Sequence, residues 1–243
     1  VEAMAVDAGS AWALAGNEIV HAQLRADGSG DSVKVDIPAV DGDRLIALVG
    51  KSGSLGGYGV AACFSSSSEI FFVDANNDHE VQTVNTCCNG ISCIGVLSCD
   101  AIACGVPLNG TVTLFNRNGD EIRAFVGHCG PVMGIYPLFA SPDVDETNLF
   151  ASRADDNTVR IWDIRERVPI FQITTSSSLT SNESYNRNIS SSCSFISVGG
   201  NNQYVMFSLH NQIGVVDIRK DFAKPVLGVV TDDYDPVSIC YNQ

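Results

Sequence analysis

The sequence predicts an all-β chain built from repeated sets of four short strands. Short apolar runs recur along the 243 residues, and clusters of Gly, Asn, Asp and Ser separate them. No long segment repeats its apolar residues at helical spacing. Hydrophobic residues make up 45% of the chain and charged residues 17%, a balance that favours a globular protein over a disordered one.

The first three sets occupy residues 1 to 126. Each strand is an apolar or alternating run that ends at residues typical of turns. The first set is expected at Val1 to Val6, Ala11 to Ala15, Glu18 to Leu24 and Ser32 to Ile37. The second is expected at Arg44 to Val49, Tyr58 to Phe64, Glu69 to Asp74 and Glu80 to Asn85. The third is expected at Ile91 to Leu97, Ala101 to Val106, Thr111 to Asn116 and Glu121 to Val126.

Two more complete sets follow, with longer connections. The fourth is expected at Val132 to Leu138, Leu149 to Arg153, Thr158 to Asp163 and Val168 to Ile173. The fifth is expected at Ser190 to Val198, Gln203 to Ser208, Gln212 to Asp217 and Pro225 to Val230. Val237 to Tyr241 then begins a sixth set. A unit that recurs in this way indicates a repeat architecture.

The fourth set carries the most specific pattern in the chain. Gly127-His128 precede its first strand, Asp156 lies in the turn between its second and third strands, and Trp162-Asp163 end the third strand. Together these residues resemble a WD repeat, which forms one four-stranded blade of a β-propeller. Partial equivalents of the Trp-Asp pair end the third strands of other sets, at Val73-Asp74, Phe115-Asn116 and Val216-Asp217.

The resemblance implies an all-β propeller of four-stranded antiparallel blades. About five blades and one further strand can be recognised, whereas WD propellers usually have seven blades. An open propeller would leave unpaired strand edges and sheet faces. We therefore expect residues 1–243 to form one WD-repeat propeller that is incomplete or a fragment of a longer chain. Unusual closure by the last strand and completion by a partner are the alternatives.

The resemblance also implies a buried chain of hydrogen bonds that joins His128, Ser152, Asp156 and Trp162 as a structural relay. Each buried polar group would then have a partner. The same histidine, serine and aspartate would suit a hydrolase triad. Nothing nearby resembles a nucleophile elbow, however, and Trp162 completes the structural set, so we expect no catalytic residue.

Arg165 completes a WDxR ending after Trp162-Asp163. The stretch from Phe150 to Arg165 resembles the box of WD-repeat substrate receptors of cullin-type ubiquitin ligases, in which the arginine helps dock on a propeller-shaped adaptor. Arg153 departs from that box, where a small residue is expected. A degraded copy ends at Arg219, and the two arginines are candidate partner-binding residues. The alternative is that each arginine pairs with the strand-end aspartate of its own blade.

The cysteines and histidines show no metal-ligand spacing. The nine cysteines lack a CxxC pair, and several fall at apolar strand positions, so they are expected to be small buried side chains in a reducing compartment. A zinc site among Cys87 to Cys104 would need paired-ligand spacing or a histidine between them, and neither is present. His21, His79 and His210 are far apart in the sequence. No metal or other cofactor is expected.

The charge balance is acidic, with 28 Asp and Glu against 14 Lys and Arg and a formal charge of −14. Direct nucleic-acid binding needs a basic surface and is therefore disfavoured, whereas a basic partner is compatible. The alternative is that the acidic residues only keep the chain soluble. No signal peptide or apolar membrane-spanning stretch is recognised, so a cytoplasmic or nuclear location is expected.

These observations predict a non-catalytic protein-interaction scaffold that presents loops and a channel face to a protein or peptide partner. One alternative is a ubiquitin-ligase substrate receptor that docks through Arg165 and Arg219. Another is an accessory propeller of an enzyme whose catalytic domain lies outside this chain. A fold by itself does not choose among these functions.

Overall fold

The computed structural model describes thirteen segments of the chain: residues 3–7, 10–15, 18–24, 29–37, 45–49, 59–65, 67–98, 100–138, 147–174, 196–199, 204–209, 212–217 and 227–230. Every regular element in these segments is a β-strand. None of the described residues belongs to a helix long and apolar enough to cross a membrane.

The strands form five four-stranded sheets, here called blades 1 to 5. Within each blade, consecutive strands pair antiparallel in chain order. Blade 1 contains β1 (Ala3–Asp7), β2 (Ser10–Ala15), β3 (Glu18–Leu24) and β4 (Gly30–Val35). Blade 2 contains β5 (Leu45–Val49), β6 (Val60–Phe64), β7 (Glu69–Asp74) and β8 (Glu80–Asn85). Blade 3 contains β9 (Cys93–Ser98), β10 (Ala101–Gly105), β11 (Val112–Phe115) and β12 (Glu121–Phe125). Blade 4 contains β13 (Val132–Pro137), β14 (Leu149–Ala154), β15 (Thr158–Asp163) and β16 (Phe171–Thr174). Blade 5 contains β17 (Ile196–Gly199), β18 (Tyr204–Leu209), β19 (Gln212–Asp217) and β20 (Leu227–Val230).

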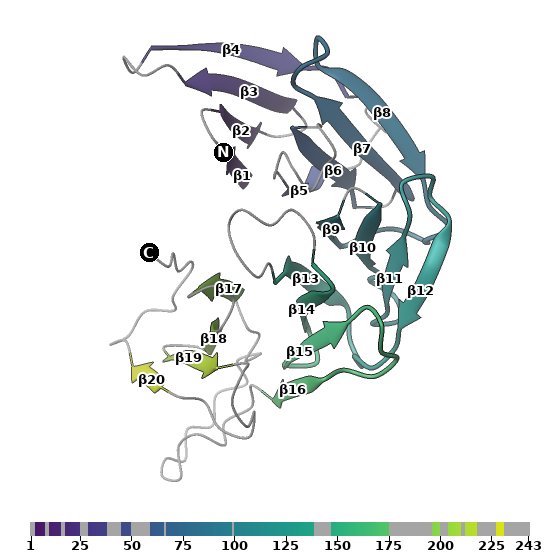
Figure 1. The fold of residues 1–243 in the computed structure, drawn as a ribbon, viewed down its shortest axis with the longest axis vertical. Helices are drawn as coiled ribbons and strands as arrows, with labels where there is room; N and C mark the ends of the chain where they lie inside the picture. The colour runs from purple at the N-terminus through teal and green to yellow at the C-terminus, as the bar shows by residue number, and fades with distance from the viewer. Residues whose placement is uncertain are drawn as a thin grey trace.

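The blades are arranged around a common centre. The first strand of each blade lies innermost and the fourth lies outermost (Figure 1). The innermost strands also contact one another in order, β1 with β5, β5 with β9, β9 with β13, and β13 with β17. This arrangement is a β-propeller, and it confirms the predicted fold class. Val237 to Tyr241 lies outside the described residues, so the predicted start of a sixth blade stays a prediction.

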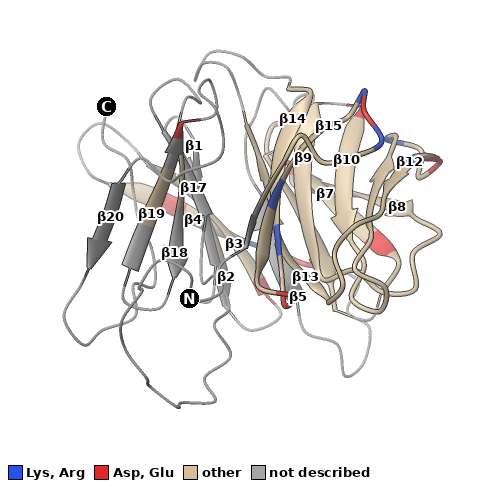
Figure 2. Cartoon of the chain, turned by 90° about the horizontal axis from the view of Figure 1, so that it is seen from below, with Lys and Arg blue, Asp and Glu red and all other residues tan. Residues whose placement is uncertain are grey.

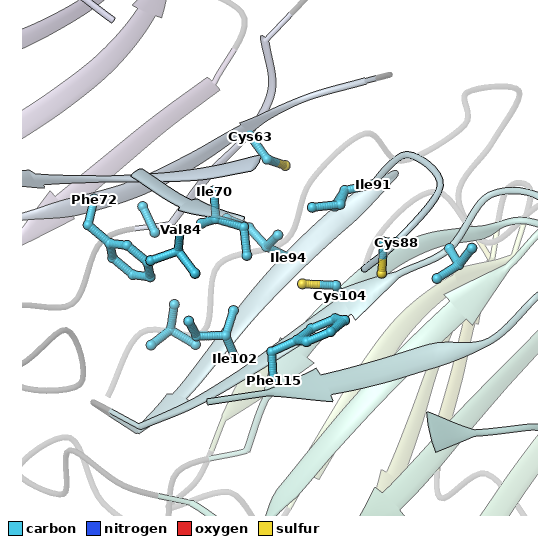
Figure 3. Close-up of a cluster of buried hydrophobic side chains, with 13 residues drawn as sticks. Cys63, Ile70, Phe72, Val84, Cys88, Ile91, Ile94, Ile102, Cys104 and Phe115 are labelled. Carbon is cyan, nitrogen blue, oxygen red and sulfur yellow. The ribbon is translucent and has the colours of Figure 1, made fainter. Parts of the chain in front are cut away.

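The core consists of apolar layers between neighbouring blades. Val60, Phe64 and Phe71 of blade 2 pack with Trp12 and Ile19 of blade 1. The layer between blades 2 and 3 is drawn in Figure 3, where aliphatic, aromatic and cysteine side chains of the two sheets interleave. Charged residues of the described strands and loops lie mainly at strand ends and in connections (Figure 2). Burial of these layers therefore holds the blades together.

Within the described residues, the start of the fourth strand of blade 4 differs noticeably from the prediction, whereas the predicted start of blade 5 at Ser190 lies outside them. The fourth strand of blade 4 begins at Phe171, whereas the apolar pattern predicted a start at Val168. The chain turns directly after β15, because the Glu166 N–H donates to the Asp163 carbonyl at 2.9 Å. Pro169 has no N–H to contribute to a strand ladder. Val168 is accordingly 67% exposed.

Candidate functional site

The β14–β15 hairpin of blade 4 positions the predicted site. Its strands pair from Leu149 opposite Asp163 to Arg153 opposite Val159. Asn157 in the turn has a φ of 56°, a left-handed conformation that asparagine tolerates better than most residues. This turn joins the second and third strands of the blade as neighbours, and His128 contacts Ser152 on the second strand.

Four predicted residues form a continuous chain of hydrogen bonds across this hairpin. Trp162 Nε1 donates to Ser152 Oγ at 2.8 Å, and His128 Nε2 lies 2.7 Å from the same oxygen. His128 Nδ1 lies 3.2 Å from each carboxylate oxygen of Asp156. The structure thus brings His128, Ser152, Asp156 and Trp162 together, and we call this set the blade 4 relay.

The chemistry of its two ends gives the relay one direction. The indole N–H of Trp162 can only donate, and an ionised Asp156 carboxylate can only accept. The Ser152 hydroxyl must therefore accept from Trp162 and donate to His128 Nε2. His128 is then a neutral imidazole whose proton is on Nδ1, and each polar group of the relay has a partner.

Burial and hydrogen bonding set the protonation states of the relay. Burial lowers the pKa of His128 below its ordinary value, although the nearby Asp156 acts in the opposite direction. Burial by itself would raise the pKa of Asp156, but hydrogen bonds from the Cys129 N–H, Thr158 and His128 together lower it. The relay is therefore neutral at the histidine and negative at the aspartate near pH 7.

Three further groups belong to this site and were not predicted. Thr158 Oγ1 donates to Asp156 Oδ1 at 2.7 Å and lies 2.9 Å from His128 Nδ1. The backbone N–H of Cys129 donates to Asp156 Oδ2 at 2.8 Å. The Arg160 guanidinium carbon lies 6.0 Å from the centre of the Trp162 ring. Only Thr158 had a sequence signal, since Asp-x-Thr in a turn favours a side-chain bond to the backbone N–H two residues on.

The hydrolase-triad alternative does not fit the position of Ser152. Its hydroxyl has the Ser-His-Asp connectivity of a triad, but the side chain is completely buried and its oxygen is shared by Trp162 and His128. A nucleophile must reach the substrate. Ser152 is thus placed to connect the hairpin and has no access to an external carbonyl group.

Arg165 lies at the exposed end of β15, away from the relay. Its Nε donates to Asp163 Oδ1 at 2.8 Å and to Asp163 Oδ2 at 3.1 Å. The Arg165 side chain is 70% exposed, whereas that of Asp163 is 9% exposed. The hydrogen bond from Arg165 also lowers the pKa of Asp163. This is the strand-end pairing that the sequence left open as the alternative, and Arg219 lies outside the described residues.

The cysteines of the described segments are unpaired thiols. Cys63, Cys88, Cys93 and Cys104 are buried, as expected for small apolar side chains, whereas Cys87 and Cys129 are exposed. Burial raises the pKa of Cys93 to about 12, so this thiol stays protonated. In the part of the chain that the structure describes, no group of three or more His, Cys, Asp or Glu residues could hold a metal ion.

His79 contacts His21 across blades, which their sequence positions did not suggest.

Comparison with known proteins identifies the fold but no family. No family model matches the chain, and no curated protein matches it significantly. Among solved structures, 1126 chains match. One comes from a structure described as "Crystal Structure of Mitotic Checkpoint Complex", with a TM-score of 0.65 and 15% sequence identity over 93% of this chain. The match covers 61% of that chain, so the present sequence spans less than two thirds of its length.

Proposed function

We propose that this chain is a WD-repeat propeller that acts as a non-catalytic protein-interaction scaffold. The observation that carries the proposal is the closed blade 4 relay. It places the Ser-His-Asp residue set inside the hairpin, where hydrogen bonds from His128 and Trp162 occupy Ser152. The order of groups from Asp156 through His128 and Ser152 to Trp162 also agrees with the relay that the WD-repeat resemblance implies.

The mechanism of such a scaffold is presentation. Apolar layers between neighbouring blades hold the sheets in a stable arrangement, and the loops at both ends of the strands are held with them. A protein or peptide then docks on loops that are already in place, which lowers the entropic cost of binding. The formal charge of −14 favours a partner with a basic surface.

The test is cross-linking mass spectrometry on the tagged full-length protein purified from its own cells. We expect a stoichiometric protein partner whose cross-links fall on loops of one end of the blades. The matched control is a variant of the protein with charge-reversed residues in the loops at the end of the blades that shows no cross-links. This variant should still bind the partner. Partners that cross-link evenly over all faces, or absence of any stable partner, would contradict the scaffold function.

A more specific candidate is a substrate receptor of a cullin-type ubiquitin ligase, working in the cytoplasm or nucleus. The observation in its favour is the exposed Arg165 at the end of β15, whose guanidinium Asp163 holds in one orientation. A planar guanidinium in a set position can make forked hydrogen bonds across an interface. Arg219 would contribute in the same way from blade 5.

Charge reversal tests this candidate. Arg165→Asp together with Arg219→Asp should abolish co-purification of a propeller-shaped ligase adaptor. Arg167→Asp is the matched control, because Arg167 is exposed two residues further along but lies outside the motif. Equal recovery of the adaptor with the double variant and the control would rule out docking through these arginines, while leaving the scaffold function intact.

A further inference from the structure

Two histidines from different blades meet between blades 1 and 2. His21 on β3 and His79 in the turn between β7 and β8 have their Nδ1 and Nε2 atoms 2.8 Å apart. His21 is 7% exposed and lies flat on Trp12, with ring centroids 4.0 Å apart and an interplanar angle of 13°. The Trp12 side chain is itself 1% exposed and belongs to the apolar layer shared by both blades. The contact is therefore part of the blade interface.

The turn that presents His79 contains two residues in the left-handed conformation. The Glu80 N–H donates to the Asn77 carbonyl at 2.8 Å, which closes a four-residue turn. Its central residues Asp78 and His79 have φ angles of 48° and 59°. Two left-handed central residues define a type I′ turn, which glycine, asparagine and aspartate favour. Asp78 fits this preference, whereas a histidine at φ 59° is less favourable than glycine or asparagine, so the strain of the turn lies at His79.

Only one proton can lie between the two facing nitrogens. In the neutral pair, one imidazole donates and the other accepts across the 2.8 Å contact. When His79 Nε2–H is the donor and His21 Nδ1 the acceptor, a proton added at His79 Nδ1 leaves this hydrogen bond intact. A second added proton makes both rings cationic and places protons on both facing nitrogens, so the bond is lost and like charges meet.

The surroundings of His21 offer little compensation for added charge. His21 Nε2 is buried and has no hydrogen-bond partner among the described residues, so the positive charge of a protonated His21 would find no acceptor at this atom. Trp12 and Val33 are the cross-strand neighbours of His21 on β2 and β4. Stacking on the Trp12 ring favours a cation, and burial opposes it. The charged groups on the packed elements are Glu18 on β3, Asp31 and Lys34 on β4, Glu69 and Asp74 on β7, Asp78 in the turn and Glu80 on β8; Lys34 donates to Glu18.

Two of these carboxylates already have partners within the hairpin. Asp74 Oδ1 accepts from the Asn76 N–H at 2.8 Å, and the Glu80 carboxylate accepts from the Asn77 side chain. Burial, followed by the charge of His79, lowers the pKa of His21. Below the ordinary histidine pKa of about 6.5, the closed pair therefore binds fewer protons than two separate histidines would bind. Acidification therefore disfavours the closed contact.

We propose that the His21–His79 contact is a pH-sensitive latch between blades 1 and 2. The latch holds the β7–β8 turn of blade 2 against Trp12 and His21 near neutral pH. It releases when the pair takes up its second proton, which frees the strained turn and uncovers Trp12. The conformational element is the turn itself, since it relaxes once His79 leaves the interface.

Hydrogen exchange of the full-length chain tests the latch. Peptides covering the β7–β8 turn and β2–β3 should exchange faster at pH 5.0 than at pH 7.5, after correction for intrinsic rates. Between the ordinary histidine pKa of about 6.5 and the lower pKa of the closed pair, the open population should grow by at most about tenfold for each pH unit. In His79→Gln, the amide can still donate to His21 but cannot titrate with it, so the acid-dependent increase should be clearly smaller than in wild type. An equal increase in wild type and variant, or none in wild type, would overturn the latch.

A second measurement keeps the latch testable if His79→Gln does not fold. Carbon-13 labelling of the histidines allows the His21 and His79 resonances of wild-type protein to be followed by NMR as the pH is lowered. The latch requires a coupled titration in two steps, with the second step clearly below the ordinary histidine pKa. Two independent titrations near the ordinary value would refute it.

Discussion

Blades 3 and 4 have the same strand order but use different chemistry at matching positions. Trp162 on β15 faces Phe150 on β14, and Phe115 on β11 faces Ile102 on β10 at the equivalent register. Both aromatic rings are completely buried. In blade 4 the ring carries an N–H that donates to a hydroxyl, whereas the Phe115 ring of blade 3 offers only apolar surface.

The residue beside each aromatic ring changes with it. Ser152 lies opposite Arg160 in blade 4, and Cys104 lies opposite Thr113 at the same step of blade 3. Figure 3 shows Cys104 with Cys88 beside the Phe115 ring, within an apolar layer. A hydroxyl in that layer would need a partner, whereas a thiol is tolerated as a small hydrophobic group.

The hairpin turns of the two blades, in contrast, share one hydrogen bond, in which a side-chain oxygen accepts from the backbone N–H two residues further along. Asp156 Oδ1 accepts from the Thr158 N–H at 3.0 Å, and Asn109 Oδ1 accepts from the Thr111 N–H at 3.0 Å. This turn contact is thus local and occurs in both blades, whereas the interior hydrogen bonds of blade 4 depend on one another. The comparison indicates that a buried polar relay is present with all its members or is replaced by apolar packing.

Truncating the central aromatic residue should have the largest effect. Trp162→Ala removes a buried ring and should lower the free energy of unfolding by about 3–5 kcal/mol, measured by urea denaturation. Trp162→Phe, which makes blade 4 resemble blade 3, should cost only about 1–2 kcal/mol, because it mainly removes the indole N–H donor. An unchanged melting temperature for Trp162→Ala would contradict the role assigned to the relay.

The second-largest loss of stability is expected from removing His128, the centre of the relay. His128→Ala leaves the Ser152 hydroxyl without its acceptor and Asp156 without one donor, at an expected cost of about 2–3 kcal/mol. A double-mutant cycle with Ser152→Ala measures the coupling, which should reach roughly 0.5–3 kcal/mol if the two residues act together. Strict additivity of the two substitutions would show that the hydrogen bond contributes nothing to stability.

The comparison also shows which features a sequence reveals. Strand periods and turn residues are local, so β7, β8, β15 and β19 begin and end where the apolar pattern predicted. The WD-repeat resemblance placed His128, Ser152, Asp156 and Trp162 because that motif has a characteristic spacing. In contrast, the contact of His21 with His79 depends on how two blades pack, and no local pattern records that distance.

One of the two apolar substitutes in blade 3 was predicted. Phe115-Asn116 was recognised as a partial equivalent of the Trp-Asp pair, whereas Cys104 matches no motif, so its equivalence to Ser152 appears only from the strand register. Similarly, Arg160 was an alternating strand residue in the sequence, and only the structure places its guanidinium near the Trp162 ring. Contacts between distant residues therefore set the limit of what the sequence predicts.

Exchanging the polar and apolar partners of the two blades should produce intermediate effects. Ser152→Cys in blade 4 weakens the acceptor for the Trp162 N–H and should cost about 1–2 kcal/mol. Cys104→Ser in blade 3 buries a hydroxyl among apolar groups and should cost about 1–3 kcal/mol. Cys104→Ala is the matched control for loss of size. If Cys104→Ser were as stable as wild type, blade 3 would contain a polar partner, and the contrast between the blades would fail.

The smallest expected effect is a pH dependence that belongs to blade 4. The pKa of His128 is lowered in the folded protein, so the unfolded chain binds a proton first as the pH falls below about 6.5. The free energy of unfolding should therefore decrease on acidification until the pH reaches the folded pKa, by at most about 1.4 kcal/mol per pH unit. The lowered pKa of Asp156 adds a loss in the same direction below about pH 4.

Blade 3 supplies the comparison for this pH effect, because its buried thiols have raised pKa values and remain neutral over the whole range. Denaturation curves between pH 7 and pH 5 should be less pH-dependent for His128→Gln than for wild type. Cys104→Ala should keep the wild-type dependence, since the His21–His79 contact and His128 are both retained. If the free energy of unfolding of His128→Gln changed with pH as steeply as that of wild type, the acid sensitivity would belong to other groups. Blade 4 would then differ from blade 3 in its hydrogen bonds but not in its pH dependence.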